Sequence, residues 1–373
     1  MKRASKPKAE SPSQPNRNKS RAAGKSTSSA IGTGQLIALV IGVLLIGFLA
    51  LRNQLFLSPE PAPTPPATPT STTSLPGATG IELHVYPEDS EQELLDLIAQ
   101  AKKRVYMKVY LLTDEQVIDA MKQAMQNGVE VRAMLEENPF GGAGTTKQMF
   151  EKLKRAGVNV KYTNPTFRFT HEKSFVIDDL AVIMTANMTK AAFTRNRELL
   201  VITRNADDVA EIAAAFEADW NRTEFVPQRP HLVWSPVNSR ERINSVINAA
   251  TRTLEVYAEV AQDTRQIALM TEAVKRGVMV RLITSPSDPP TDAERRGLDA
   301  LQAGGVKVRY VRSPYIHAKM FVADGTFAFT GSENITATSL DLNRELGILI
   351  SDQPAIRRML EAFEKDWSKG VDR

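Results

Sequence analysis

The sequence predicts an α/β protein. We expect two duplicated α/β/α sandwich repeats, each a mixed sheet flanked by helices, packed with pseudo-twofold symmetry around one site and preceded by a transmembrane helix. Three observations carry this prediction. Residues 81–373 repeat themselves with an offset near 147, each copy alternates short apolar strands with helices, and residues 31–51 carry no charge. Alternation of strands and helices is typical of α/β folds.

The duplication is visible in five pairs of short segments that occur in the same order. They are Tyr86-Pro87 with Ser235-Pro236, Asn127–Arg132 with Arg276–Arg281, Ala156–Tyr162 with Gly304–Tyr310, Asn196–Leu199 with Asn343–Leu346, and Phe216–Trp220 with Phe363–Trp367. The offset between partners drifts only from 149 to 147. A period of this length is too long for a solenoid repeat, so each copy is expected to be a domain-sized unit. We place the two repeats at residues 81–228 and 229–373.

Each repeat reads as strands alternating with helices. Strands are expected at Ile81–Tyr86 and Arg104–Leu111, and their counterparts at Leu232–Ser235 and Thr253–Val260. After the first strand, Ser90-x-x-Glu93 predicts a capping box at the start of an amphipathic helix. Later Gly-Val-x-Val segments predict further strands, since glycine before a β-branched run ends a helix and begins a strand.

The N-terminal stretch predicts a membrane anchor. As a helix, residues 31–51 would span about 31 Å, close to the thickness of a membrane hydrocarbon core. The stretch is longer than the apolar part of a signal peptide and lacks a clear cleavage site, which favours an uncleaved anchor. Residues 1–30 carry a net charge of +7. We therefore expect a disordered basic tail at 1–30 in the cytoplasm, a single-pass anchor in the cell membrane, and the repeats outside the cytoplasm.

Residues 52–80 read as a Pro/Thr-rich linker. Seven prolines lie between residues 58 and 80, which predicts an extended stalk with a reach of up to ~70 Å. Because the tail takes up the positive charge, residues 31–373 have a net charge of −3. They lack the bulk positive charge of a typical nucleic-acid binder, although a local basic groove remains compatible with this composition. The absence of cysteine excludes disulfides and Cys-ligated metal centres.

Each repeat contains one His-x-Lys-(x)4-Asp motif with the same followers. The first copy has His171, Lys173 and Asp178, followed by Asn187 and Glu198; the second has His317, Lys319 and Asp324, followed by Asn334 and Glu345. Residues i and i+2 of a strand share a face, so each histidine is expected to project beside its lysine. Such a face suits a phosphate group. Two imidazoles in one pocket would let one attack while the other protonates the leaving oxygen.

A lone His-x-Lys is usually a surface strand with a solvated lysine. Here, two of only four histidines fall at equivalent places in a duplication and bring the same neighbours, which favours a functional interpretation. His84 and His231 have no such neighbours and are taken as structural or surface residues.

The paired motifs resemble those of the phospholipase D superfamily, and the resemblance covers about residues 81–373. It implies a metal-independent enzyme without a cofactor that works through a covalent phosphohistidine. It further implies His171 as nucleophile, His317 as general acid, and Lys173, Lys319, Asn187 and Asn334 as ligands of the phosphate oxygens. By the same resemblance Glu198 and Glu345 hold the histidine tautomer, and Asp178 and Asp324 are structural.

One residue departs from the family pattern. The second copy has the usual glycine, Gly331, before Ser332-x-Asn334, whereas the first has Met184 before Thr185-x-Asn187. A methionine where the backbone approaches substrate could narrow the pocket on that side.

Four functions remain open from the sequence. The first is a membrane-anchored phosphodiesterase that cleaves phospholipids or transfers their phosphatidyl group, and its main alternative is a metal-independent nuclease. A cardiolipin synthase-like transferase usually has more N-terminal membrane segments. An inactive binding module is disfavoured because both motifs are complete. A monomer is plausible, because duplication supplies within one chain what single-copy relatives obtain by dimerising.

Overall fold

The computed structural model describes residues 76–140, 142–287 and 289–373. The predicted tail, anchor and most of the linker lie outside these residues. Within the described ranges, no helix is both long and apolar enough to cross a membrane.

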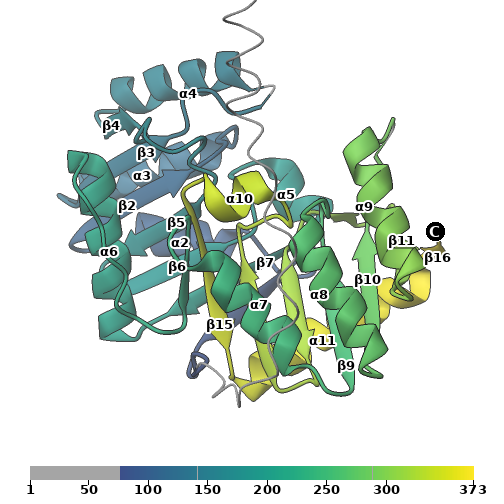
Figure 1. Ribbon diagram of the computed structural model, residues 1–373. Coiled ribbons are helices and arrows are strands. Elements are labelled where there is room, and N and C mark those ends of the chain that lie inside the picture. The colour runs from purple at the N-terminus through teal and green to yellow at the C-terminus, as the bar shows by residue number, and fades with distance from the viewer. Residues whose placement is uncertain (1–75, 141, 288) are drawn as a thin grey trace, which may run out of the picture. The chain divides into compact units, whose positions relative to one another are not determined.

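The first repeat is built around one mixed sheet. Its elements are β1 (Glu82–Tyr86), α2 (Gln92–Ala99), β2 (Arg104–Val109), α3 (Glu115–Gln126), β3 (Glu130–Leu135), α4 (Ala143–Arg155), β4 (Asn159–Tyr162), β5 (Lys173–Ile177), β6 (Leu180–Met184), α5 (Lys190–Thr194), β7 (Asn196–Thr203) and α6 (Ala206–Asn221). The strand order is β1-β7-β6-β5-β2-β3-β4 (Figure 1). Strands β2, β3 and β4 pair in parallel and the others antiparallel.

The second repeat has the same order of elements, with two short strands, β12 and β16, added. They are β8 (Leu232–Ser235), α7 (Ser239–Ala249), β9 (Thr253–Tyr257), α8 (Thr264–Lys275), β10 (Met279–Thr284), α9 (Asp292–Ala303), β11 (Lys307–Tyr310), β12 (Tyr315–Ile316), β13 (Met320–Ala323), β14 (Phe327–Gly331), α10 (Ala337–Asp341), β15 (Glu345–Ile350), α11 (Gln353–Lys369) and β16 (Val371–Asp372). Strands β8-β15-β14-β13-β9-β10-β11 reproduce the first sheet's order. The prediction of two duplicated α/β repeats is confirmed.

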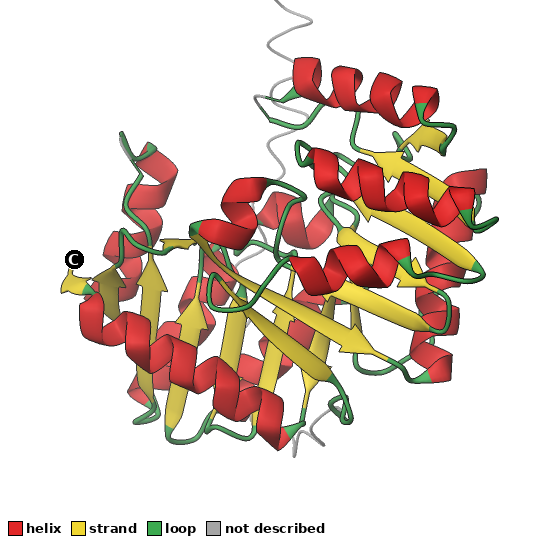
Figure 2. Cartoon of the chain, turned by 180° about the vertical axis from the view of Figure 1, so that it is seen from behind, coloured by secondary structure: helices red, strands yellow, loops and turns green. Residues whose placement is uncertain are grey.

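Three apolar clusters hold the layers together. One lies between the outer face of the first sheet and helices α2 to α5, and a second lies between the second sheet and α7 to α10. The third contains side chains of both sheets together with α6 and α11, such as Val201, Phe216, Leu346 and Phe363. Each sheet therefore has helices on both faces, as the view from behind shows (Figure 2). The shared cluster makes the two repeats one packed body.

Two reciprocal buried ion pairs join the repeats. The Arg197 guanidinium donates to both carboxylate oxygens of Asp366, at 2.7 and 3.0 Å. Its counterpart Arg344 donates to Asp219 at 2.8 Å. These residues belong to the repeated Asn-Arg-Glu-Leu and Phe-Glu-x-Asp-Trp segments. Sequence reasoning used those segments only to recognise the duplication, and the structure shows that they form the contact between the copies.

One local prediction was wrong. Helix α2 begins after Glu91 without a side-chain cap, and no capping box forms at Ser90. The Ser90 hydroxyl accepts a hydrogen bond from the amide of Gln92 at 3.1 Å, but the Glu93 carboxylate lies 3.3 Å from Nδ1 of His84. A buried histidine thus takes the carboxylate that a capping box would need. Among the described helices, the capping box is found on α9, between Thr291 and Glu294.

Candidate active site

The two motif histidines are each held by a glutamate from the other repeat. Nδ1 of His171 lies 2.8 Å from Oε2 of Glu345, and Nδ1 of His317 lies 2.8 Å from Oε1 of Glu198. Both carboxylates are fully buried, whereas the imidazoles retain 13% and 10% exposure. A carboxylate accepts a hydrogen bond from Nδ1–H, which leaves Nε2 of each ring for chemistry. The Nδ1 partner of each motif histidine therefore comes from the other repeat.

Pairing between the repeats explains this crossed arrangement. Strand β12 runs parallel to β7, with Ile316 opposite Arg197, which brings the next residue, His317, beside Glu198. On the other side, Thr170 forms a bridge with Arg344, and His171 therefore lies beside Glu345. The histidines precede β5 and β13 and do not lie within them, so the predicted strand through each motif begins later than expected.

The two motif lysines are buried beside their histidines. Lys173 donates to the carbonyl oxygen of His171, and Lys319 donates to that of His317 at 2.6 Å. Within the described residues, no carboxylate forms an ion pair with Lys173. Burial lowers the pKa of Lys173 to about 7; Lys319 lowers it further, and the Glu345, Glu259 and Glu198 carboxylates offset only part of the fall. A bound phosphate would add negative charge beside the Lys173 ammonium group.

The asparagines that follow the motifs offer polar groups without protein partners. Oδ1 of Asn187 and Oδ1 of Asn334 are both buried and unpaired among the described residues. Buried amide oxygens normally accept a hydrogen bond. These two oxygens are acceptors and suit a ligand N–H or O–H, whereas a phosphate oxygen would need the Nδ2 groups of the two asparagines as donors. The Thr185 hydroxyl donates a hydrogen bond to Oε2 of Glu198 at 2.5 Å.

Further contacts fix the two buried glutamates. Asn343 donates to Glu345 at 2.9 Å, and its counterpart Asn196 donates to Glu198 at 3.1 Å. The pKa of each glutamate lies below its ordinary value: burial raises it, but the facing histidine and a nearby lysine lower it by more. Both are therefore carboxylates able to orient an imidazole.

The motif aspartates lie at the far ends of strands β5 and β13. Asp178 and Asp324 adopt positive φ angles of 51° and 53°. The Asp178 carboxylate accepts hydrogen bonds from the amides of Lys102, Lys103 and Arg104. Asp324 accepts three equivalent amide bonds, from residues 251 to 253. These contacts tie a turn to the start of the neighbouring strand, and we keep the interpretation of both residues as structural.

Two residues that sequence reasoning missed complete the site. Tyr110 and Glu259 follow β2 and β9 and are equivalent under the 149-residue offset. The Tyr110 ring packs edge-on against the His171 ring at 4.6 Å, whereas Oε2 of Glu259 lies 2.7 Å from Nζ of Lys319 and 3.4 Å from Nε2 of His317. The offset pairs these positions, but nothing in the local sequence marks them as part of the site.

The glycine of the second repeat makes room for a carboxyl group. A Cβ on Gly331 would strike Oε2 of Glu333, and one on Gly347 would come within 2.8 Å of it. In the first repeat the equivalent residues are Met184, Ala186 and Leu200, an apolar set. Met184 packs in the core of its own repeat, so the suggestion that it narrows the pocket was wrong. The first repeat therefore has hydrocarbon side chains where the second repeat has the buried carboxyl group of Glu333.

Glu333 gives a prediction about stability. Both of its carboxyl oxygens are buried without a hydrogen-bond partner among the described residues. Burial, reinforced by the nearby Glu345 carboxylate, raises the pKa of Glu333 well above its ordinary value. A raised folded-state pKa gives stability that is complete below the unfolded value, near 4.5, and is lost as the pH rises towards the folded value.

We therefore expect Glu333→Gln to remove this loss of stability with rising pH. Relative to wild type, the variant should gain about 1.4 kcal/mol in free energy of unfolding for each pH unit above 4.5 until the folded-state pKa is reached. Urea unfolding between pH 4.5 and 8.5 measures this difference. Parallel pH dependences of variant and wild type would show that Glu333 is ionised in the folded protein.

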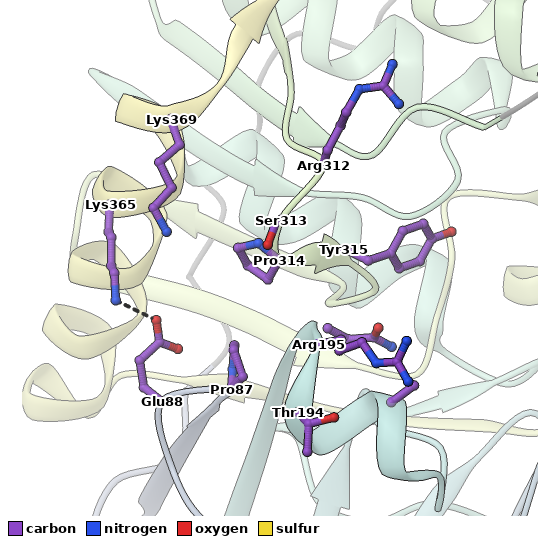
Figure 3. A pocket seen from close by; sticks show the side chains of 12 residues that line it. Pro87, Glu88, Thr194, Arg195, Arg312, Ser313, Pro314, Tyr315, Lys365 and Lys369 are labelled. Carbon is purple, nitrogen blue, oxygen red and sulfur yellow. Dashed lines mark hydrogen bonds and ion pairs between the residues drawn. The ribbon is translucent and has the colours of Figure 1, made fainter.

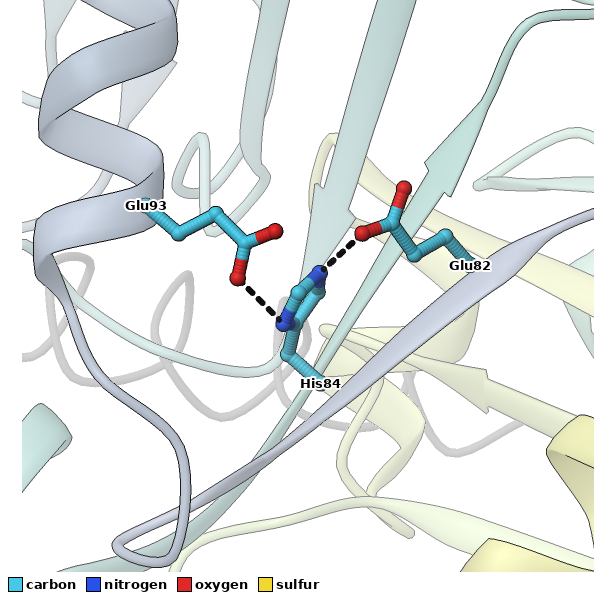
Figure 4. Close-up of side chains that lie close together, drawn as sticks. All are labelled: Glu82, His84 and Glu93. Carbon is cyan, nitrogen blue, oxygen red and sulfur yellow. Dashed lines mark hydrogen bonds and ion pairs between the residues drawn. The ribbon is translucent and has the colours of Figure 1, made fainter.

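The other two histidines lie outside this arrangement. His84 on β1 contacts Glu82 through Nε2 at 3.1 Å and Glu93 through Nδ1 (Figure 4). Carboxylates face both ring nitrogens, with Asp89 also 3.9 Å from Nδ1, whereas a metal ion would take one nitrogen only. His231 lies 2.8 Å from Asp208. Both histidines are buried and join neighbouring elements.

A basic pocket of about 670 Å³ is lined by residues of both repeats, and none of the motif histidines, lysines or glutamates belongs to its lining (Figure 3). Its wall includes Asn196 and Tyr315, which directly neighbour the chain segments of Glu198 and His317. Four cationic side chains line it, from Arg195, Arg312, Lys365 and Lys369, against the single carboxylate of Glu88. That carboxylate already pairs with Lys365, at 2.8 Å. The pocket is therefore suited to an anionic group.

A known protein family matches both repeats of the chain. The family described as "Cardiolipin synthase, PLD-like domain" matches residues 94–220 and 243–367, one match in each repeat. The chain belongs to this phospholipase D-like family. Cardiolipin synthase B of Salmonella typhimurium is 24% identical over 306 residues, which cover 70% of this chain and 73% of that protein. Cardiolipin synthase of Oceanobacillus iheyensis is 23% identical, over 78% of this chain and 69% of the relative.

Solved structures show the same fold. Phosphatidylserine synthase of Haemophilus influenzae superposes with a TM-score of 0.63 at 14% identity, covering 80% of this chain and 89% of that one. Polyphosphate kinase of Porphyromonas gingivalis superposes with a TM-score of 0.61 at 16% identity, covering 77% and 50%. At these identities the likeness concerns the fold. The expected membership of the phospholipase D superfamily is confirmed by the family match.

Proposed function

We propose that the protein is a phospholipase D-type enzyme that transfers the phosphatidyl group of a phospholipid to an alcohol. The observation that carries this proposal is the crossed pair of His–Glu contacts, with one buried lysine that donates to the backbone carbonyl of each histidine. Such a site offers two imidazole nitrogens and a set of donors to a single phosphodiester. The similarity to cardiolipin synthases supports a lipid substrate and a transfer reaction.

The first step forms a covalent intermediate. Nε2 of His171 attacks phosphorus as the bond to the leaving alcohol oxygen breaks, and Glu345 holds the proton on Nδ1 throughout. His317 gives its Nε2 proton to the leaving oxygen, so that a neutral alcohol departs. The phosphatidyl group is then bound to His171.

The second step reverses these roles. An acceptor alcohol gives its proton to Nε2 of His317 and attacks phosphorus, and the bond to His171 breaks. The product is a new phosphodiester, and both histidines return to their starting state. Water in place of the alcohol gives hydrolysis to phosphatidic acid by the same route.

The lysines and asparagines stabilise charge on the phosphate oxygens. Lys173, Lys319, Asn187 and Asn334 would hold the non-bridging oxygens, where negative charge increases in the transition state. The pKa of Lys173 is lowered because burial and the nearby Lys319 outweigh the surrounding glutamates, and a bound phosphate would favour the charged form of Lys173. The pocket lined by Arg195 and Arg312 would favour an anionic substrate next to the reacting phosphate.

The placement of the enzyme in the cell is part of the proposal. Residues 1–30 form the cytoplasmic tail, 31–51 the membrane anchor and 52–80 the linker, and the catalytic repeats lie outside the cytoplasm. An anchored enzyme on a stalk would act on lipids of the membrane that holds it. The duplicated repeats bring both histidines from one chain, which supports an active monomer.

A parallel substrate assay tests the proposal. The full chain is reconstituted in vesicles of phosphatidylglycerol or phosphatidylcholine, and offered single- and double-stranded DNA separately, always with EDTA. We expect conversion of phospholipid with retained activity in EDTA, and transfer products when glycerol is added. Cleavage of DNA with no lipid turnover would make the protein a nuclease, and activity abolished by EDTA would contradict the metal-free mechanism.

A further inference from the structure

The two halves of the site differ at one pair of equivalent positions. Tyr110 follows β2 and Glu259 follows β9, so duplication has placed a neutral ring on one side and a carboxylate on the other. The Tyr110 ring contacts the His171 ring and lies 5.1 Å from Nζ of Lys173. Glu259 contacts His317 and Lys319, which are the counterparts of His171 and Lys173 in the second repeat. The two histidines, which are equivalent in sequence, therefore have different electrostatic surroundings.

His317 faces a carboxylate at each ring nitrogen. Nδ1 lies 2.8 Å from Glu198 on β7, and Nε2 lies 3.4 Å from Glu259 after β9. An imidazolium can donate a hydrogen bond from both nitrogens, whereas a neutral imidazole can donate from one only. Both ring nitrogens of His317 thus have a carboxylate acceptor within reach.

Among the described residues, His171 contacts one carboxylate only. Its Nδ1 contacts Glu345, and the Tyr110 ring packs against the His171 ring at an interplanar angle of 70°, with the centroids 4.6 Å apart. The pKa of His171 lies below its ordinary value, because burial outweighs the attraction of Glu345. A neutral ring with a free Nε2 lone pair is the form that can attack phosphorus.

The lysines show the same difference. Nζ of Lys319 pairs with Glu259 at 2.7 Å, whereas Lys173 has no carboxylate partner among the described residues. The pKa of Glu259 lies below its ordinary value, mainly because His317 and Lys319 face it while burial opposes them. The negative charge of Glu259 is therefore present over the working pH range.

Other titratable groups surround this cluster at longer range. They contribute to the local field and form no hydrogen bond or ion pair with the His317 ring: His171, Lys173, Tyr110, Glu294 and Tyr315. Among the described residues, Glu198 and Glu259 are the two carboxylates that contact the His317 ring.

We propose that Glu259 is a positioning residue that keeps a proton on Nε2 of His317 until substrate binds, and thereby makes His317 the acid and His171 the nucleophile. This inference rests on the proposed two-histidine reaction. When the leaving oxygen approaches Nε2, it replaces Glu259 as the acceptor of the N–H hydrogen bond, and the proton passes to the leaving alcohol. Glu259 stays in place through Lys319 and regains its partner when the acceptor alcohol returns a proton.

The test is the pH dependence of Glu259→Gln. The variant keeps the size of the side chain and loses its charge. We expect the basic limb of the profile of kcat/KM against pH to move to lower pH by about one unit, with about tenfold lower kcat/KM above the limb and little change below it. Glu259→Asp, which restores the charge, should recover the wild-type profile in part. An unchanged basic limb in the Gln variant would overturn the proposal.

A second readout needs no turnover. In the full chain with ¹⁵N-labelled histidine, the His317 ring should release its proton at lower pH in Glu259→Gln than in wild type, by about one unit. Equal titration of the two proteins would also overturn the proposal. Because this measurement uses no substrate, it separates a wrong role for Glu259 from a wrong reaction, which the substrate assay tests by itself.

Glu294→Gln is the matched control. Glu294 lies on α9 near Glu259 but contacts neither His317 nor Lys319, and it accepts from Thr291 in a capping box that glutamine can also form. The control makes the same charge change at a neighbouring position. Its profile should match wild type, and an equal shift in both variants would assign the effect to the overall field and contradict a specific role for Glu259.

Discussion

Replacing His317 with Asn is expected to lower kcat on a phospholipid by about 10²–10⁴-fold, because the leaving alkoxide loses its proton donor. The covalent step itself should survive when the leaving group needs no proton. With a p-nitrophenyl phosphodiester, His317→Asn should therefore still release a burst of one nitrophenolate per enzyme. The enzyme then stalls, since deprotonation of the acceptor also needs His317.

The corresponding change at His171 should behave differently. His171→Asn removes the nucleophile, so we expect neither burst nor turnover with either substrate. His84→Gln is the control: this histidine pairs with Glu82 and Glu93 (Figure 4), and its loss should leave the burst unchanged. Rapid-mixing absorbance measures all three variants. A burst in His171→Asn that is absent in His317→Asn would reverse the roles of the two histidines.

The second large effect concerns the ion pairs between the repeats. Arg197→Met is expected to lower the free energy of unfolding by about 3–5 kcal/mol, since it leaves the fully buried Asp366 carboxylate without a cationic partner. Tyr257 donates to Asp366 at 2.8 Å but carries no charge to balance it. The loss should weaken activity as well, because Arg197 directly precedes Glu198 on β7.

Arg344→Met gives a matched comparison, since its partner keeps a second cation. Nζ of Lys108 lies 2.6 Å from Asp219 and remains after Arg344 is removed. We therefore expect a smaller loss than for Arg197→Met. Lys275→Met, which removes an exposed pair with Glu272, should cost under about 1 kcal/mol. Urea unfolding followed by tryptophan fluorescence orders the three variants. Equal costs for Arg197 and Arg344 would show that the uncompensated charge is not the cause.

The fold could be predicted because the repeated segments and the strand periodicity can each be recognised in short stretches of sequence. The expected strand Leu232–Ser235 has the bounds of β8, and Ile81–Tyr86 differs from β1 by one residue. The capping box at Ser90 failed for a tertiary reason, because His84 attracts the Glu93 carboxylate. Propensity is a weak prior where such a contact competes with it.

The residues of the site were predictable, but the contacts between them were not. Repeated motifs identify the histidines, lysines, asparagines and glutamates as sets. Which glutamate holds which histidine depends on the pairing of β12 with β7 and of Thr170 with Arg344, and no local pattern encodes a register between repeats. Glu259 and Glu333 were missed for the related reason that their counterparts, Tyr110 and Ala186, are chemically unlike them.

Identification of the covalently modified residue tests the central claim most directly. The full chain is mixed with a ³²P-labelled phosphodiester in EDTA, quenched in alkali within its first turnover, and digested for mass spectrometry under conditions that preserve phosphohistidine. The account predicts label on the peptide that contains His171, none on the peptide of His317, and no label in His171→Asn. Label on His317, or turnover without any labelled histidine, would contradict it.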